Sequence, residues 1–218
     1  MRELIENIRA VGFDIDGTLY FQNKEDSFLP NLYGALATTL SISSDEVLTF
    51  FETKRAQYGN SLQTARALCA GHVAQDLLDE LFWDILEKHE EIDTSQYDSR
   101  LSEYMKELST QYRLFVVTGN RERHAARKFS ALGIDSSLFH ATCYGTENKY
   151  EGMKGISESL GVSPSQMIYF GDQEKTDIRC AADLGMVTVK IGASFDTYSS
   201  ATFQARQVFE LKELLLGK

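Results

Sequence analysis

Two aspartates separated by a single residue follow an apolar segment near the start of the chain: Asp14 and Asp16 come directly after residues 8–13. If residues 8–13 form a strand, alternate side chains share a face, so both carboxylates point to the same side. Two carboxylates this close do not ionise equally. One stays ionised as a nucleophile or metal ligand, and the other is biased toward the protonated form of a general acid. A strand with only a structural role does not normally end on two unpaired carboxylates, so the pair predicts an enzyme.

The hydrophobic pattern predicts the elements that position this pair. After about residue 95, short apolar runs alternate with segments of helical spacing. The runs predict strands over 8–13, 112–117, 139–144, 167–170 and 186–191, and the spacing predicts helices over 101–108, 121–132, 151–160, 176–184 and 207–216. This alternation is typical of an α/β fold, a Rossmann-like parallel sheet with helices on both faces.

Polar residues follow three of these predicted strands: Asp14 and Asp16, then Thr118 and Gly119, then Asp172. The carboxyl ends of parallel strands meet at one edge of the sheet, where such folds bind their ligands. We therefore expect these side chains to converge on one site.

Residues 22–93 break the alternation and contain three segments of helical spacing. Apolar residues recur every three or four positions in 29–40, 47–58 and 73–86. Ser43 and Glu46 have the spacing of a capping box at the start of the second of these helices. The pattern predicts an inserted α-helical domain over 22–93 and a core domain formed by 1–21 and 94–218.

These features together resemble the haloacid-dehalogenase-like (HAD) hydrolase superfamily. Its four motifs occur in order: Asp14-Ile15-Asp16-Gly17-Thr18-Leu19, then Val116-Val117-Thr118-Gly119-Asn120, then Lys149, then Gly171-Asp172 with Asp177 five positions on. The resemblance covers roughly residues 6–20 and 95–192. It implies a phosphatase whose inserted helices form a cap over the site. Within the insert, residues 58–62 resemble the Tyr-Gly-x-x-Leu stretch of pyrimidine 5′-nucleotidase-like members.

The resemblance assigns the acidic residues to magnesium-dependent phosphoryl transfer. Asp14 would attack phosphorus, forming an aspartyl-phosphate, and would bind Mg²⁺. Asp16 would bind the metal through its backbone carbonyl, while its side chain protonates the leaving alcohol and then activates water. Asp172 would complete the metal site. Asp177 would contact the metal's ligands rather than the metal, or would bind the metal through a water molecule. A cation is needed because an anionic nucleophile attacks an anionic substrate, and Mg²⁺ prefers about six oxygen ligands.

The same resemblance assigns phosphate binding to the second and third motifs. Thr118 and the backbone N–H groups of Gly119 and Asn120 would hold the phosphoryl oxygens. A lysine would neutralise the phosphate and Asp14. Lys149 is the first candidate, although the proline that often follows this lysine is absent here, and Lys154 is the alternative.

The expected activity is hydrolysis of a small phosphorylated metabolite, such as a nucleotide, phosphoglycolate or a sugar phosphate. Three alternatives remain open from the residues. A phosphomutase uses the same aspartate pair, a dehalogenase needs neither metal nor Asp16, and a non-catalytic binding module could use the same scaffold. The sequence does not choose the substrate.

Composition and sequence pattern argue against binding to a nucleic acid polymer or insertion into a membrane. The formal charge of −10 and the lack of a basic run argue against binding to a nucleic acid polymer. No stretch approaches the about 18 apolar residues of a membrane span, and the first strand begins too early for a signal peptide. The odd number of widely spaced cysteines predicts reduced thiols rather than disulfides. We therefore expect a cytoplasmic protein of undetermined oligomeric state.

Overall fold

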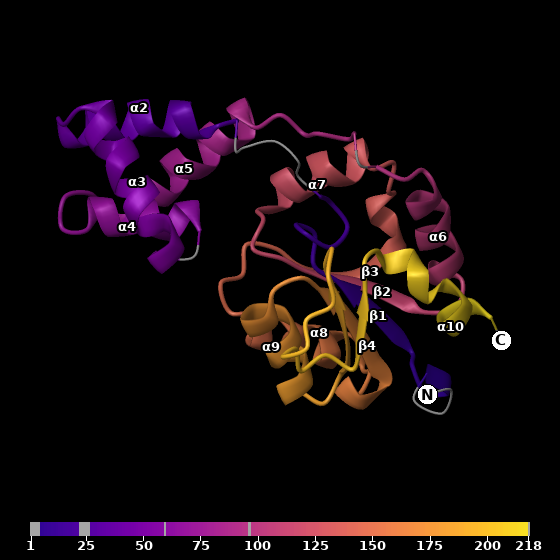
Figure 1. Cartoon of the computed structure of the whole chain (residues 1–218). Helices are drawn as coiled ribbons and strands as arrows, with labels where there is room; N and C mark the ends of the chain where they lie inside the picture. The colour runs from indigo at the N-terminus through magenta and orange to yellow at the C-terminus, as the bar shows by residue number, and fades with distance from the viewer. Residues whose placement is uncertain (1–4, 22–26, 59, 96, 218) are drawn as a thin grey trace. The chain divides into compact units, whose positions relative to one another are not determined.

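The computed structural model describes residues 5–21, 27–58, 60–95 and 97–217. By its contacts the chain divides into two compact units (Figure 1). The first, called here the α/β unit, comprises residues 1–23 and 92–218, and the second, the helical unit, comprises residues 24–91.

The α/β unit is built on one sheet of six parallel strands in the order β3-β2-β1-β4-β5-β6. The strands are β1 (Ala10–Phe13), β2 (Arg113–Val117), β3 (Phe139–Cys143), β4 (Met167–Gly171), β5 (Val187–Ile191) and β6 (Phe203–Ala205). Starting from β1, the chain adds β2 and β3 on one side of it, and then β4, β5 and β6 on the other side. The point where the strand order reverses therefore lies between β1 and β4.

Helices cover both faces of this sheet, which confirms the predicted fold class (Figure 1). Side chains of alternating residues define two cores, because successive strand residues point to opposite faces. Val11 and Phe13 pack on the same side as α6 and α7, whereas Ala10 packs on the side of α8 and α9. The helices of this unit are α6 (Arg100–Ser109), α7 (Glu122–Ala131), α8 (Lys149–Leu160), α9 (Arg179–Asp183) and α10 (Lys212–Leu216).

All five predicted strands are present, and the structure adds β6, which was not predicted. That strand has only three residues and includes the polar Gln204, so it gives too short a hydrophobic signal. Two predicted helices begin differently from the expectation. The segment over 176–184 starts as a π-helical turn, Glu174–Ile178, before α9, and the last helix starts as a 3₁₀ turn, Val208–Leu211, before α10.

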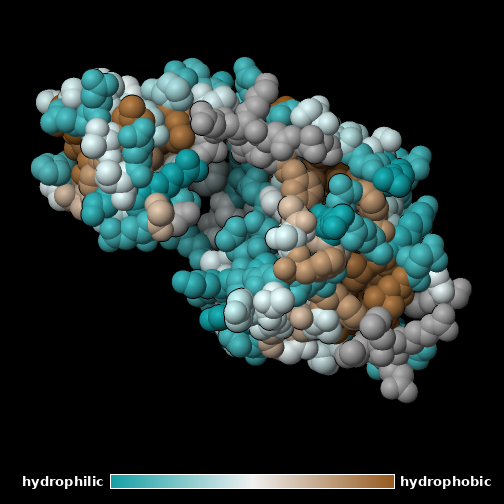
Figure 2. All heavy atoms as spheres, in the orientation of Figure 1, coloured by the Kyte–Doolittle hydropathy of each residue, from teal (hydrophilic) through white to brown (hydrophobic). Residues whose placement is uncertain are grey.

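The helical unit contains α2 (Leu29–Leu40), α3 (Ser44–Tyr58), α4 (Ser61–Cys69) and α5 (Gln75–His89). Its core is a cluster of apolar side chains from these helices, among them Leu32, Leu36, Phe51 and Phe82. In the view of Figure 2 the outer surface of these helices is mainly hydrophilic, and hydrophobic atoms show between them. This distribution is that of amphipathic helices packed around their own core.

The predicted capping box is confirmed: the Ser43 N–H donates to the Glu46 carboxylate at 2.8 Å, and the Glu46 N–H donates to Ser43 Oγ at 3.2 Å. The helix α4 was not predicted from the sequence. Its start is fixed by Asn60, whose side chain accepts the N–H of Gln63 at 2.8 Å. None of the helices among the described residues is both long and apolar enough to cross a membrane.

Candidate active site

The two central strands bring the first and fourth motifs together. Phe13 at the end of β1 pairs in register with Phe170 of β4, and the N–H of Asp14 donates to the Phe170 carbonyl at 2.9 Å. Asp14 and Asp172 therefore leave adjacent strands at the same sheet edge. This edge is beside the reversal of strand order, where open α/β sheets bind ligands.

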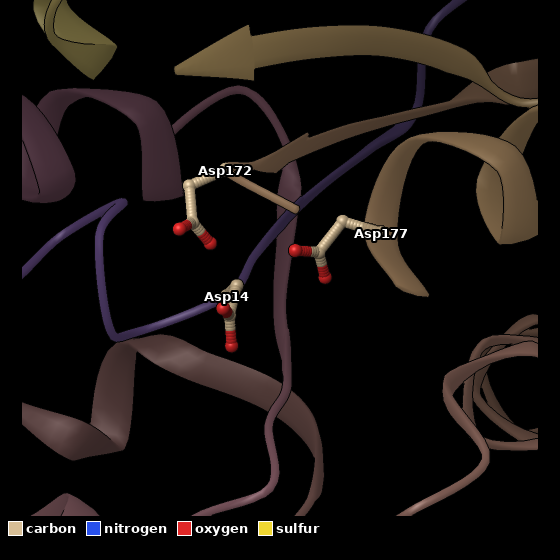
Figure 3. Close-up of side chains that lie close together, drawn as sticks. All are labelled: Asp14, Asp172 and Asp177. Carbon is tan, nitrogen blue, oxygen red and sulfur yellow. The ribbon is translucent and has the colours of Figure 1, made fainter. Parts of the chain in front are cut away.

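Three carboxylates meet at this edge (Figure 3). Asp14, Asp172 and Asp177 each offer an oxygen, and these oxygens all lie within 4.8 Å of one another. Asp177 reaches the cluster from the π-helical turn after β4 and is fully buried. Its carboxylate accepts the N–H of Gln173 at 2.9 Å, so the turn itself fixes the side chain.

Two glycines make room for these carboxylates. A Cβ atom on Gly171 would lie 2.3 Å from Cβ of Asp177. One on Gly17 would lie 2.4 Å from Oδ2 of Asp172, and Gly17 also has a positive φ of 73°, which other residues rarely adopt. The glycines of the first and fourth motifs are therefore required by the packing of the acidic cluster.

Lys149 lies among these carboxylates. It occupies the first turn of α8, which begins two residues earlier than predicted, and its Nζ lies 2.9 Å from Oδ1 of Asp14 and 2.6 Å from Oδ1 of Asp177. Burial opposes the positive charge of Lys149, but the two carboxylates outweigh it and raise its pKa. Lys154, the alternative candidate, is exposed on the same helix.

Burial also shifts the acids of the cluster. It raises the pKa of Asp14 to about 7, against the opposing effect of Lys149 and with the help of Asp177. It raises the pKa of Asp172 to about 6, again helped by Asp177. Oδ1 of Asp172 is buried and has no hydrogen-bond partner among the described residues. Clustered hard oxygen donors, one of them unsatisfied, fit a divalent cation such as Mg²⁺.

Asp16 is held outside this cluster. Its Oδ1 lies 2.5 Å from Nζ of Lys128 on α7, and its Oδ2 accepts the side-chain amide of Asn120 at 2.6 Å. Partial desolvation opposes ionisation of the half-exposed Asp16, but Lys128 and Asn120 outweigh it, so the pKa lies below its ordinary value. In the free protein the shifts of the pair are thus the reverse of the expected division: Asp14, not Asp16, is biased toward the protonated form. The reason is that burial of Asp14, together with the neighbouring carboxylates, outweighs Lys149, whereas Lys128 and Asn120 outweigh the desolvation of Asp16.

The loop after β2 carries the second motif. Its backbone is held by the loop after β3, where the Thr146 N–H donates to the Thr118 carbonyl and the Gly145 N–H donates to that of Asn120. The N–H of Asn120, an expected phosphate donor, here donates to Oγ1 of Thr118 at 3.2 Å. Thr118 and Asn120 are both buried.

The family described as haloacid dehalogenase-like hydrolase matches residues 11–191, which is most of the chain. The chain belongs to this family. No curated protein matches it significantly.

Solved structures share the fold of this HAD-family chain. A HAD phosphatase from Thermococcus onnurineus is 24% identical with a TM-score of 0.63, over 97% of this chain and 99% of that one. The HAD-like hydrolase SP0104 from Streptococcus pneumoniae is 21% identical with a TM-score of 0.62, over 95% and 98%. A 2-haloacid dehalogenase from Pseudomonas syringae pv. Tomato is 16% identical with a TM-score of 0.58, again over 95% and 98%. Identities this low establish the fold and not the reaction.

Two further residues of the site in this HAD-family chain lie outside the four motifs. Tyr169 of β4, whose hydroxyl donates to the Val117 carbonyl at 2.9 Å and lies 3.5 Å from Oδ1 of Asp177, has the pattern of an ordinary core residue. The second residue, Lys128, could have been identified from the sequence. It lies at helical spacing among the buried Ala125, Phe129 and Leu132, and a lysine on an apolar helix face requires a partner.

Proposed function

We propose that this HAD-family hydrolase is a magnesium-dependent phosphomonoesterase that acts on a small phosphorylated metabolite through an aspartyl-phosphate on Asp14. The observation that supports the proposal most strongly is the cluster of Asp14, Asp172 and Asp177 around the buried Lys149. Such a cluster supplies both ligands for a cation and a positive charge beside the nucleophile.

The three carboxylates would hold the metal, together with the backbone carbonyl of Asp16. Bound Mg²⁺ would supply positive charge that favours the ionised form of Asp14 and neutralises the substrate phosphate. Lys149 contributes a second positive charge at the same place, and its contact with Asp177 keeps it oriented toward Asp14.

The residues of the chain then divide the reaction into two steps. In the first, an oxygen of Asp14 bonds to phosphorus, the bond to the leaving oxygen breaks, and Asp16 gives that oxygen a proton. In the second, water attacks phosphorus, Asp16 accepts a proton, and phosphate leaves Asp14. The lowered pKa of Asp16 favours its ionised form in the free protein, so Asp16 takes up a proton from solvent before the first step, and the second step returns it to this protonated form. Thr118 and the N–H of Gly119 would bind the phosphoryl oxygens.

Asp16 is also the feature that favours phosphate over carbon–halogen chemistry. A dehalogenase of this fold needs neither a metal nor a second aspartate after the nucleophile. Here Asp16 is present and is fixed by two donors from other elements, and two further carboxylates accompany Asp14. These features support the phosphatase over the dehalogenase.

The helical unit is proposed to act as the cap that supplies substrate contacts and excludes water. The weak similarity of residues 58–62 to pyrimidine 5′-nucleotidases makes nucleotides one class to test.

Cys69, Cys143 and Cys180 are free thiols, which supports a reducing location such as the cytoplasm.

The proposal is tested by a screen of nucleotides, sugar phosphates and phosphoglycolate with Mg²⁺, measuring release of inorganic phosphate. We expect turnover of at least one ester, loss of that turnover in excess EDTA, and a loss of at least about 10³-fold in Asp14→Asn, which cannot form the acyl-phosphate.

Asp183→Asn provides the matched control, because Asp183 is exposed on α9, and it is expected to retain activity. Turnover that survives in Asp14→Asn or in EDTA would defeat the proposal. Transfer of phosphate between sugar hydroxyls without net release would identify a mutase, and release of halide from a haloacid would identify a dehalogenase.

A further inference from the structure

The side chain of Lys128 is unusually buried for a lysine. Its side chain is only 3% exposed and extends from the buried face of α7, where its Nζ lies 2.5 Å from Oδ1 of Asp16 and 4.9 Å from the centre of the Tyr20 ring. Lysines are seldom this buried, because removing the ammonium from water is costly even when it is paired. A methionine would fill the same apolar space without that cost. Stability alone is therefore a weak explanation for this residue.

Asp16 does not need the lysine for its own solvation. Its side chain is 49% exposed, so water could satisfy the carboxylate. An exposed aspartate that contacts only water samples several rotamers. Here one oxygen is held by Lys128 and the other by Asn120, two donors from different parts of the chain. The carboxylate is thereby fixed in one orientation while half of its surface stays accessible.

Asn120 also connects this carboxylate to the second motif. Its side-chain amide, which donates to Asp16, lies 3.2 Å from Oγ1 of Thr118, and its backbone N–H donates to the same oxygen. The orientation of Asp16 is thus coupled to the loop that is expected to hold phosphate. Lys128 forms a salt bridge with the same carboxylate from α7.

We propose that Lys128 is a positioning residue that holds the Asp16 carboxylate in the orientation needed to exchange a proton with the substrate's leaving oxygen. The proposal rests on the phosphatase function proposed above. A positional error of about 1 Å in a reacting group is enough to cost on the order of 10²-fold in rate.

The test compares Lys128→Met and Lys128→Arg with wild type, using kcat/KM on two esters, the best alkyl phosphate of the screen and p-nitrophenyl phosphate. The alkoxide leaving group needs a proton and the nitrophenolate does not. We expect Lys128→Met to lower kcat/KM about 10²-fold on the alkyl phosphate and less than about 5-fold on the aryl phosphate. Lys128→Arg, which keeps a cation, should retain most of the alkyl phosphatase activity.

Lys106→Met removes an exposed lysine from α6 and is the matched control, expected to behave as wild type. Thermal unfolding verifies that each variant folds, and Lys128→Gln replaces Lys128→Met if that variant does not. An equal loss on both esters, no loss on either, or no recovery with arginine would overturn the role of Lys128. Absence of turnover in wild type would instead defeat the phosphatase function itself.

Discussion

The Nζ atom of Lys149 lies 2.9 Å from Oδ1 of Asp14, with both side chains at least nine-tenths buried. The two residues are far apart in the sequence, and the contact places a fixed positive charge beside the residue proposed to attack phosphorus. It also identifies which lysine of α8 belongs to the site.

We expect Lys149→Met to lower kcat/KM by about 10²–10³-fold, because the phosphoryl group and Asp14 lose a preorganised charge in a buried site. It should also destabilise the fold by about 3 kcal/mol, since Asp14 and Asp177 stay buried without their cation. Phosphate release and denaturant unfolding measure the two effects. Lys154→Met, which changes an exposed lysine on the same helix, is the control. The assignment fails if Lys154→Met is the variant that loses activity.

The acidic cluster should make the metal-free protein less stable as pH rises. The pKa of Asp172 is raised from 3.8 to about 6, so the folded state holds this proton more tightly than the unfolded state. The protonated Asp172 carboxyl therefore stabilises the folded state at low pH, and this stabilisation is lost as the pH rises through about 6. Asp172→Asn cannot ionise, so in EDTA at pH 8 it should be more stable than wild type by about 1–2 kcal/mol.

Thermal unfolding from pH 4 to pH 8 tests this expectation. The advantage of Asp172→Asn should vanish near pH 4, and Mg²⁺ at pH 8 should stabilise wild type more than the variant, because only wild type retains all three carboxylates. Lower stability of Asp172→Asn than wild type at pH 8 in EDTA would contradict the destabilising role of this carboxylate.

Glu174 has the opposite pH dependence. Burial opposes its charge, but the N–H and hydroxyl of Ser200, the hydroxyl of Ser199 and the ammonium of Lys190 outweigh it and lower its pKa from 4.5 to about 2. These bonds tie the loop after β5 to the turn that carries Asp177. Their stabilising effect is therefore present above about pH 4.5 and is lost as pH falls toward about 2.

We expect Glu174→Gln to be less stable than wild type by about 1–2 kcal/mol at pH 7, with the difference shrinking between pH 4.5 and pH 2. Denaturant unfolding across this range measures it, and Glu158→Gln on the exposed side of α8 is the matched control. A difference that stays constant with pH would show that the carboxylate charge is not what holds the loop.

Sequence patterns predicted the strands well because buried parallel strands are short, continuous apolar runs bounded by polar residues and glycine. The capping box of Ser43 and Glu46 was predictable for a related reason, since its bonds are local. Residues 203–205 were missed because they are too few to show a period. Residues 61–69 were missed because two of the buried side chains of that helix, Ser61 and Thr64, are polar and weaken its apolar pattern.

The sequence by itself determined the α/β fold, the sheet edge that carries the motifs, and the candidate residues from Asp14 to Asp177, because strand alternation and chain order are local properties. Only the tertiary structure decided how their charges are shared. It placed Lys149 between Asp14 and Asp177, and it paired Asp16 with Lys128. The physical reason is that a pKa depends on burial and on charges within a few ångströms, and those neighbours come from helices distant in the sequence.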